Sequence, residues 1–81
     1  MPHEELREKN IRLVIENALD SFLENGIEKT KVADVAHRSG LTERSVFRYF
    51  ETKADLVLAA SLLYWNRILA LIDRMSHENS D

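Results

Sequence analysis

Apolar residues recur along the chain at spacings of three and four, which place them on one face of a helix. Four stretches show this pattern, at about residues 11–25, 31–38, 42–50 and 53–75. The pattern therefore predicts an all-α fold, in which the first three helices form a bundle and a long fourth helix follows.

The middle of the chain, residues 30–53, has the features of two helices joined by a tight turn. Thr30 and Thr42 stand where N-caps belong, at the starts of the second and third helices. Gly40 accepts the left-handed conformation that ends a helix, and Leu41 follows as an apolar plug. This arrangement predicts a helix-turn-helix, whose second helix enters the DNA major groove. A helical hairpin that binds nothing would look much the same, so the pattern alone leaves both interpretations open.

Several short motifs occur in the order and spacing of a known DNA-binding domain. They are Ala18-Leu19 with Phe22 and Gly26, Val32 with Asp34-Val35-Ala36, Gly40-Leu41-Thr42, Phe47-Arg48-Tyr49-Phe50, and Thr52-Lys53. Together they resemble the DNA-binding domain of the TetR family of transcriptional regulators, over roughly half of the chain. The resemblance implies a domain at residues 11–56 that binds double-stranded DNA. It also implies two copies on a palindromic operator, and a regulator that is usually a repressor.

Length and composition narrow the class of protein. A chain of 81 residues is at most one domain and buries only about 60% of the surface of its unfolded form. The absence of cysteine excludes disulfides and Cys-based metal sites or nucleophiles. We find no apolar run of the roughly 18 residues that would indicate a membrane span, and the polar N-terminus does not resemble a signal peptide. We therefore expect a cytoplasmic protein, associated with the nucleoid and not with a membrane.

The net charge of −3 conceals an uneven distribution. Residues 1–28 carry −4 and residues 54–81 carry −2, whereas residues 29–53 carry +3. The basic excess thus falls on the helix-turn-helix, where DNA phosphates would be neutralised. An excess this small is also compatible with an ordinary solvated face, so it supports the assignment without establishing it.

Base reading is expected from the first turn of the third helix, at residues 42–45. Arg44 can donate two parallel hydrogen bonds to guanine, although a side chain this long could instead tilt the helix outward. Two roles are open for Glu43, which could accept from a cytosine amino group or could only stabilise the helix N-terminus. Phe47 stands where the family usually has tyrosine, so it keeps an aromatic surface and loses a hydroxyl.

Backbone contacts are expected on either side of these residues. Thr30 and Lys31 begin the second helix and are candidate phosphate anchors, with Thr30 as readily a simple cap. The resemblance implies a backbone contact for Lys53, and Arg48 is a candidate phosphate clamp. The complete set expected to contact DNA is Thr30, Lys31, Thr42, Glu43, Arg44, Ser45, Phe47, Arg48, Tyr49 and Lys53.

The sequence departs from the family at two places. Residues 1–10 are expected to form a frayed polar arm, which is basic in many relatives and here contains more acids than bases. Ala33 stands where relatives often have an arginine that reaches a base. Both departures weaken the expectation of DNA contact outside the third helix.

The fourth helix is apolar on more faces than the small bundle can cover. Leu56, Ala60 and Leu63 form one row, which can close the domain. A second row predicts self-association and comprises Leu58, Leu62, Trp65, Leu69 and Ile72. In the family this helix leads to a larger helical domain that binds a small-molecule effector and forms the homodimer. Here residues 76–81 are polar, so we expect a DNA-binding half without its sensor.

Two functions remain from different classes. The first is sequence-specific DNA binding by a TetR-like regulator. The second is a helical interaction module that pairs through the fourth helix with little DNA binding, which the acidic arm and Ala33 favour. An enzyme is the least expected class, because we find no nucleophile with a base, paired catalytic carboxylates, phosphate loop or metal-binding His spacing, and no cofactor is expected.

Overall fold

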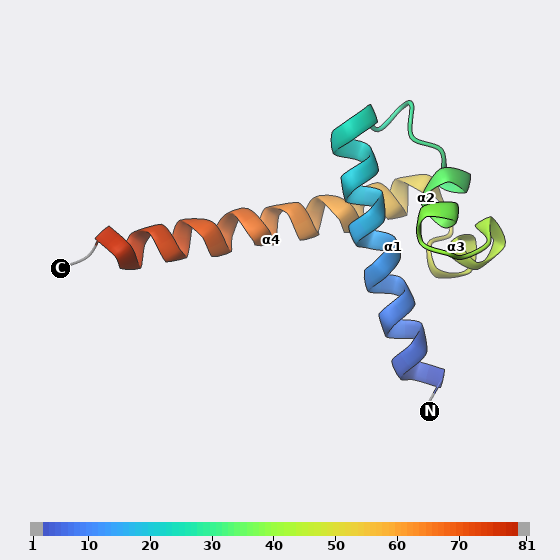
Figure 1. Ribbon diagram of the computed structural model, residues 1–81, viewed down its shortest axis with the longest axis horizontal. Helices are drawn as coiled ribbons and strands as arrows, with labels where there is room; N and C mark the ends of the chain where they lie inside the picture. Colours follow the sequence, from blue (N-terminus) through green and yellow to red (C-terminus); the bar gives the residue numbers. More distant parts are fainter. Residues whose placement is uncertain (1–2, 80–81) are drawn as a thin grey trace.

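The computed structural model of the chain describes residues 3–79, and the side chains of residues 3–77. It contains four helices: α1 (His3–Asn25), α2 (Val32–Arg38), α3 (Glu43–Tyr49) and α4 (Lys53–Asn79). No strand occurs within these residues, so the expected all-α fold is confirmed. Figure 1 shows that α4 starts beside α2 and α3, crosses α1 and then projects well beyond it.

All four helices contribute to one small core at the crossing of α1 and α4. Leu41 and Phe50 pack against it from the two ends of α3, and Val57 and Leu63 pack against it from α4. The sequence pattern identified most of these positions correctly, because burial follows the helical spacing of three and four. The buried apolar residues are Val14, Ala18, Leu19, Phe22, Val32, Val35, Ala36, Val46, Leu56 and Ala60.

The turn between α2 and α3 has the hydrogen bonds of a Schellman motif. Gly40 has a φ of 70°, which is the left-handed conformation expected for it. The Gly40 amide donates to the His37 carbonyl at 3.0 Å, and the Leu41 amide donates to the Ala36 carbonyl at 2.9 Å. These bonds satisfy the last carbonyls of α2 and fix the direction in which the chain enters α3.

Two of the predicted caps are confirmed. The Thr42 hydroxyl accepts from the Ser45 amide at 3.1 Å at the start of α3. At the start of α4, the Thr52 amide donates to the Asp55 carboxylate at 3.1 Å, while the Asp55 amide donates to the Thr52 hydroxyl at 3.2 Å. This reciprocal pair is the capping box that the spacing predicted.

The predicted cap at Thr30 is wrong. Lys31 occupies the N-cap position of α2, and no side chain caps that helix. The Thr30 hydroxyl instead donates to the carbonyls of Gly26, at 2.8 Å, and Ser21, at 3.1 Å. It therefore closes the loop after α1 and does not start α2.

The two ends of the chain are more helical than expected. The frayed arm predicted for residues 1–10 is wrong for residues 3–10, which form the first turns of α1. Residues 76–79 likewise continue α4 and are not a separate tail. The remaining parts of these two predictions, residues 1–2 and 80–81, lie outside the described residues.

The expectation that no segment is apolar enough to indicate a membrane span is wrong for α4. By length and composition alone, the segment Lys53–His77 of α4 could cross a membrane, because an 18-residue window within it has a mean hydropathy of 1.5. A single helix of this kind is weak evidence for a membrane protein. The first turns of α4 place Leu56 and Ala60 in the protein core, which assigns that part of the helix to the bundle.

The Gly40→Ala substitution tests the turn. A Cβ atom at this position would meet nothing within 4 Å, so the cost arises only from the left-handed backbone. We expect a loss of about 1–2 kcal/mol in the free energy of unfolding, measured by urea denaturation. The Gly40→Asn variant should lose less, because asparagine tolerates this conformation better. Equal stability of Gly40→Ala and the unchanged chain would contradict the role assigned to the turn.

Candidate nucleic-acid interface

The outer side of α3 is exposed, while its inner side is anchored by one residue. Val46 is the buried side chain of this helix, with 0% of its surface exposed. Arg44 and Arg48 are exposed on the opposite side. Glu43 is exposed at the start of the helix, and Phe47 retains 39% of its surface. The helix therefore presents charged and aromatic groups outward from a fixed position, as a recognition helix must.

The first turn of α3 contains two kinds of side chain. Thr42 and Ser45 bond to each other, since the Thr42 hydroxyl donates to the Ser45 hydroxyl at 3.0 Å. The Arg44 side chain forms no hydrogen bond or ion pair with any residue that the structure describes. Arg44 is thus available to a base edge without first breaking an internal contact.

The candidate backbone anchors differ in exposure. Lys31 is exposed at the start of α2, and Lys53 is half-buried at the start of α4. Thr30 retains only 3% of its surface, and its hydroxyl is occupied within the loop, as described above. Its expected contact with phosphate through the side chain is therefore excluded by burial.

Tyr49, at the end of α3, contacts α1. The Asn10 amide nitrogen donates to the Tyr49 hydroxyl at 3.2 Å, and the Arg7 guanidinium lies 5.5 Å from the centre of the Tyr49 ring. Neither α1 residue was identified from the sequence. A signal was present, because Arg7 and Asn10 continue the three- and four-residue spacing that reaches Val14.

Polar contacts hold the C-terminal end of α2 on α1. Arg38 donates to the Ser21 hydroxyl at 2.9 Å and to both carboxylate oxygens of Glu24, at 3.0 and 3.2 Å. Asn17 donates to the Ser39 hydroxyl at 3.1 Å. Because α2 in turn packs on α3, these contacts help to set the position of the recognition helix.

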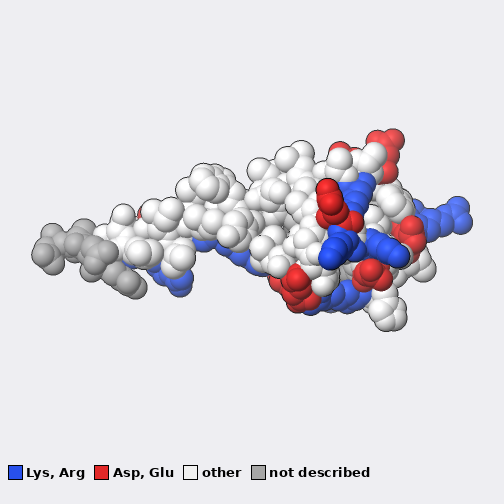
Figure 2. Space-filling view, turned by 90° about the horizontal axis from the view of Figure 1, so that it is seen from above, with Lys and Arg blue, Asp and Glu red and all other residues white. Residues whose placement is uncertain are grey.

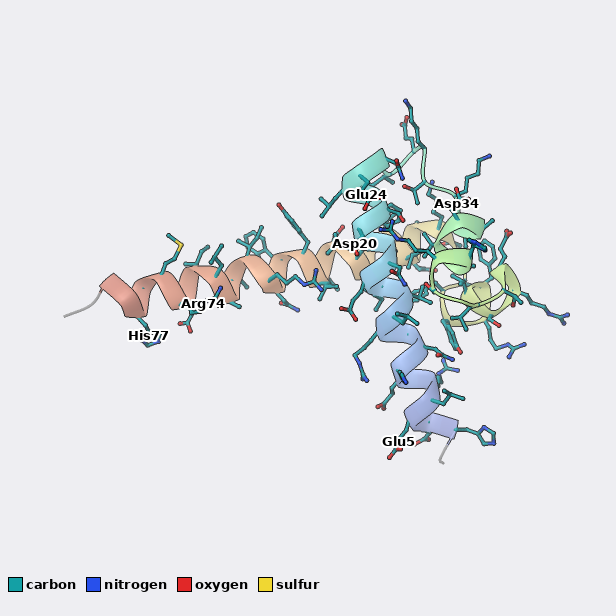
Figure 3. All side chains as sticks on the ribbon, in the orientation of Figure 1. Glu5, Asp20, Glu24, Asp34, Arg74 and His77 are labelled. Carbon is teal, nitrogen blue, oxygen red and sulfur yellow. The ribbon has the colours of Figure 1, made fainter. Side chains whose placement is uncertain are left out.

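The Arg38–Glu24 pair also shifts the ionisation of both groups. The hydrogen bond from Arg38, and then its positive charge, lower the pKa of Glu24 below its usual range. The same hydrogen bond raises the pKa of Arg38. Glu24 lies near the C-terminal end of α1 (Figure 3), with both side chains partly in solvent, so the pair contributes only modestly to stability.

The surface charge is mixed around the bundle. Figure 2 shows Lys and Arg together with Asp and Glu over the end formed by the bundle, while the side of α4 in view is mostly uncharged. Within residues 3–79, no group of three or more His, Asp or Glu side chains could hold a metal ion.

The four-helix fold and the exposed outer side of α3 define the class of protein. This class is a helix-turn-helix domain of a DNA-binding transcription regulator.

Comparison with known families agrees with this class. The family described as bacterial regulatory proteins, tetR family, matches residues 14–60, which is more than half of the chain. The chain therefore belongs to the TetR family of bacterial regulatory proteins.

Individual relatives match over a limited part of their length. A fatty acid metabolism regulator protein of Bacillus subtilis is 25% identical over 65 residues, which cover 80% of this chain and 32% of that protein. The HTH-type transcriptional regulator TtgR of Pseudomonas putida is 37% identical over 46 residues, which cover 57% of this chain and 22% of that protein. The chain thus spans no more than about a third of the length of these relatives. No solved structure matches it significantly.

The Glu24→Gln substitution tests the Arg38–Glu24 pair through pH. Because the pKa of Glu24 is lower in the folded chain, its contribution is complete above the unfolded value of about 4.3. The contribution is lost as the pH falls through the folded value. We therefore expect the variant to be slightly less stable than the unchanged chain at pH 7 in urea unfolding, and the difference to shrink as the pH falls below about 4.3.

Glu28→Gln is the matched control, because Glu28 is exposed and forms no ion pair among the described residues. It should show no such pH-dependent difference. A Glu24→Gln deficit that stayed constant from pH 7 to pH 3 would contradict the assignment.

Proposed function

We propose that the chain recognises a palindromic operator in double-stranded DNA, with two copies each placing α3 in the major groove. One observation carries this proposal: α3 is fixed by Val46 and exposes Arg44 with no internal partner among the described residues. An arginine in the first turn of a recognition helix is suited to a guanine edge. A regulator that occupies its operator in this way acts most simply as a repressor.

Phosphate contacts are assigned to Lys31, Arg48 and Lys53. Lys31 and Arg48 are exposed, and Lys53 lies within the Thr52–Asp55 capping box that fixes the start of α4. Such contacts position the protein on DNA without reading its sequence. Ser45 and Thr42 bond to each other, so their part in base reading is secondary to that of Arg44.

The protein acts in the cytoplasm, together with the DNA, and requires no cofactor. By resemblance to the family, a small-molecule effector acts through a further helical domain and not through the helix-turn-helix. The helices of this chain serve to bind DNA and to pair with a second copy.

The exposed face of α4 supports pairing. Within the bundle, Leu56, Ala60 and Leu63 face inward. The same row continues with Arg67, which pairs with Glu16 of α1 at 3.5 Å, and with Arg74 farther along α4. Arg74 and His77 lie on one side of α4 in Figure 3. The opposite side stays apolar along its length, and its exposed residues are Leu58, Leu62, Trp65, Leu69 and Ile72.

The amount of exposed surface is sufficient for a partner. The chain exposes 6226 Å², whereas a compact monomer of its mass would expose about 5,000 Å². The excess of roughly 1,200 Å² exceeds the 800 Å² or so that each partner contributes to a standard interface. Leu62 and Trp65 line two hollows, of about 520 and 230 Å³, on either side of the crossing with α1, and these can receive side chains of a second copy.

A second candidate function is an interaction module that pairs through α4 with little DNA binding. The exposed apolar face of α4 favours it, because that face is larger than DNA binding requires. The two candidates differ in whether a DNA sequence is selected, which the next experiment measures.

Selection from a pool of random duplex DNA, at two salt concentrations, tests operator recognition. We expect enrichment of a palindromic motif by the unchanged chain. Arg44→Ala should relax one base position, with a loss of discrimination of about 1–3 kcal/mol. Lys53→Ala should weaken all sequences alike and reduce the salt slope by about one.

Arg74→Ala is the control, because Arg74 is an exposed cation far along α4 from α3. It should leave both selectivity and salt slope unchanged. If no motif is enriched, and affinity at physiological salt stays in the range of about 10⁻⁴ to 10⁻⁶ M, operator recognition by this chain is refuted.

Light scattering coupled to size exclusion tests pairing through α4. At a chain concentration of about 100 μM, well above a micromolar dissociation constant, we expect the unchanged chain to be associated. The Leu62→Glu, Leu69→Glu double variant should be monomeric, because it buries charges in the apolar face. Both residues are about half exposed in the single chain, so folding should persist by circular dichroism.

Arg74→Glu provides the matched change of charge on the polar side of α4, and it should remain associated. A strictly monomeric profile for the unchanged chain at this concentration would refute pairing.

A further inference from the structure

The N-terminal turns of α1 and the end of α3 form a shallow groove of about 320 Å³. Arg7 and Asn10 line it from α1, and Arg48 and Tyr49 line it from α3. Two arginine residues therefore line a space beside the recognition helix. Glu4 lines the same groove and partly offsets their charge.

The Tyr49 hydroxyl has an incomplete set of hydrogen bonds. It accepts from the Asn10 amide nitrogen at 3.2 Å. A phenolic hydroxyl also carries one proton to donate, and this proton has no acceptor among the described residues. The bond from Asn10 occupies a lone pair and so directs the proton away from α1.

The Tyr49 ring is restrained as well. The Arg7 guanidinium lies 5.5 Å from the ring centre, within the range of a cation–π contact. Tyr49 is half-buried, so the ring has little room to turn. Asn10 and Arg7 together fix where the Tyr49 hydroxyl points, although Asn10 is 39 residues away from Tyr49 in the sequence.

We infer that Asn10 is a positioning residue for DNA binding, which orients the Tyr49 hydroxyl to donate to a backbone phosphate held in the groove between Arg7 and Arg48. The inference rests on the proposed function and adds a contact made jointly by α1 and α3. A phosphate oxygen supplies the acceptor that the Tyr49 proton lacks, and a charged acceptor gives a stronger hydrogen bond than a neutral one. Donation by Asn10 also polarises the hydroxyl and makes it a better donor.

A double-mutant cycle on the full chain tests this inference. Affinity for duplex DNA from the random pool is measured for the unchanged chain, Asn10→Ala, Tyr49→Phe and the double variant, at a temperature where circular dichroism shows all four folded. We expect each single variant to bind about five- to twenty-fold more weakly. The double variant should bind no more weakly than Tyr49→Phe, because Asn10 acts only through the hydroxyl.

Asn10→Asp distinguishes orientation of the hydroxyl from simple bracing. An aspartate accepts the Tyr49 proton, so the contact between the helices persists and thermal stability should change little, while the proton is withdrawn from the phosphate. The repulsion of the new charge is measured separately by making Asn10→Asp in the Tyr49→Phe background. We expect the loss of affinity to be at least about three-fold larger when the hydroxyl is present. Asn25→Ala makes the same side-chain truncation at the other end of α1, away from Tyr49, and serves as the control. It should leave DNA affinity unchanged.

Failure of the inference is distinct from failure of the proposed function. If the unchanged chain binds a selected motif but Asn10→Ala binds equally well, or the two single losses add, the positioning role is overturned and operator recognition stands. If the unchanged chain shows only non-specific affinity, both are overturned.

Discussion

The position of α3 depends on the burial of a single side chain. At seven residues the helix is too short to be stable alone, and Val46 is its buried residue. Leu41 and Phe50, just outside its two ends, add partial packing against the same core. The Schellman turn at Gly40 fixes the approach, and the Thr42 cap fixes the first turn. This small set of contacts orients all the side chains on the outer side of α3. The direction in which these side chains are presented therefore depends on packing in the core beneath them.

Periodicity and cap spacing predicted most of the fold, because the core of a small helical bundle obeys local rules. Val35, Val46 and Leu56 are buried where their spacing places them. Thr30 does not cap α2, because that helix begins with Lys31 at its N-cap and the Thr30 hydroxyl lies against the Gly26 and Ser21 carbonyls. The path of the loop after α1 determines this placement, and the spacing of residues along the chain does not. The polar residues 3–10 lack the apolar stripe that marks a helix in the sequence, but their Glu, Arg and Lys side chains are good helix formers, so α1 begins at His3.

The exposed positions of α3 were predictable from the sequence, whereas the contact between α3 and α1 was not. Outward positions on α3 follow from one buried residue and helical geometry, whereas Tyr49 and Asn10 are 39 residues apart. The spacing within α1 places Arg7 and Asn10 on the same face as Val14, but it does not identify Tyr49 as their partner. The contact with Tyr49 depends on the angle at which α1 passes α3, which the core sets. On α4, by contrast, the row predicted to close the domain does so: Leu56 and Ala60 are buried, and Leu63 packs against the core.

The separation of inner from outer residues on α3 has an evolutionary consequence. Glu43, Arg44 and Arg48 contribute nothing to the core, so substitution at these positions costs little folding free energy. Thr42 and Val46 are not interchangeable in this way, since one caps the helix and the other anchors it. Descendants of this chain can therefore acquire new operator preferences through single substitutions, while the scaffold that presents them is inherited unchanged.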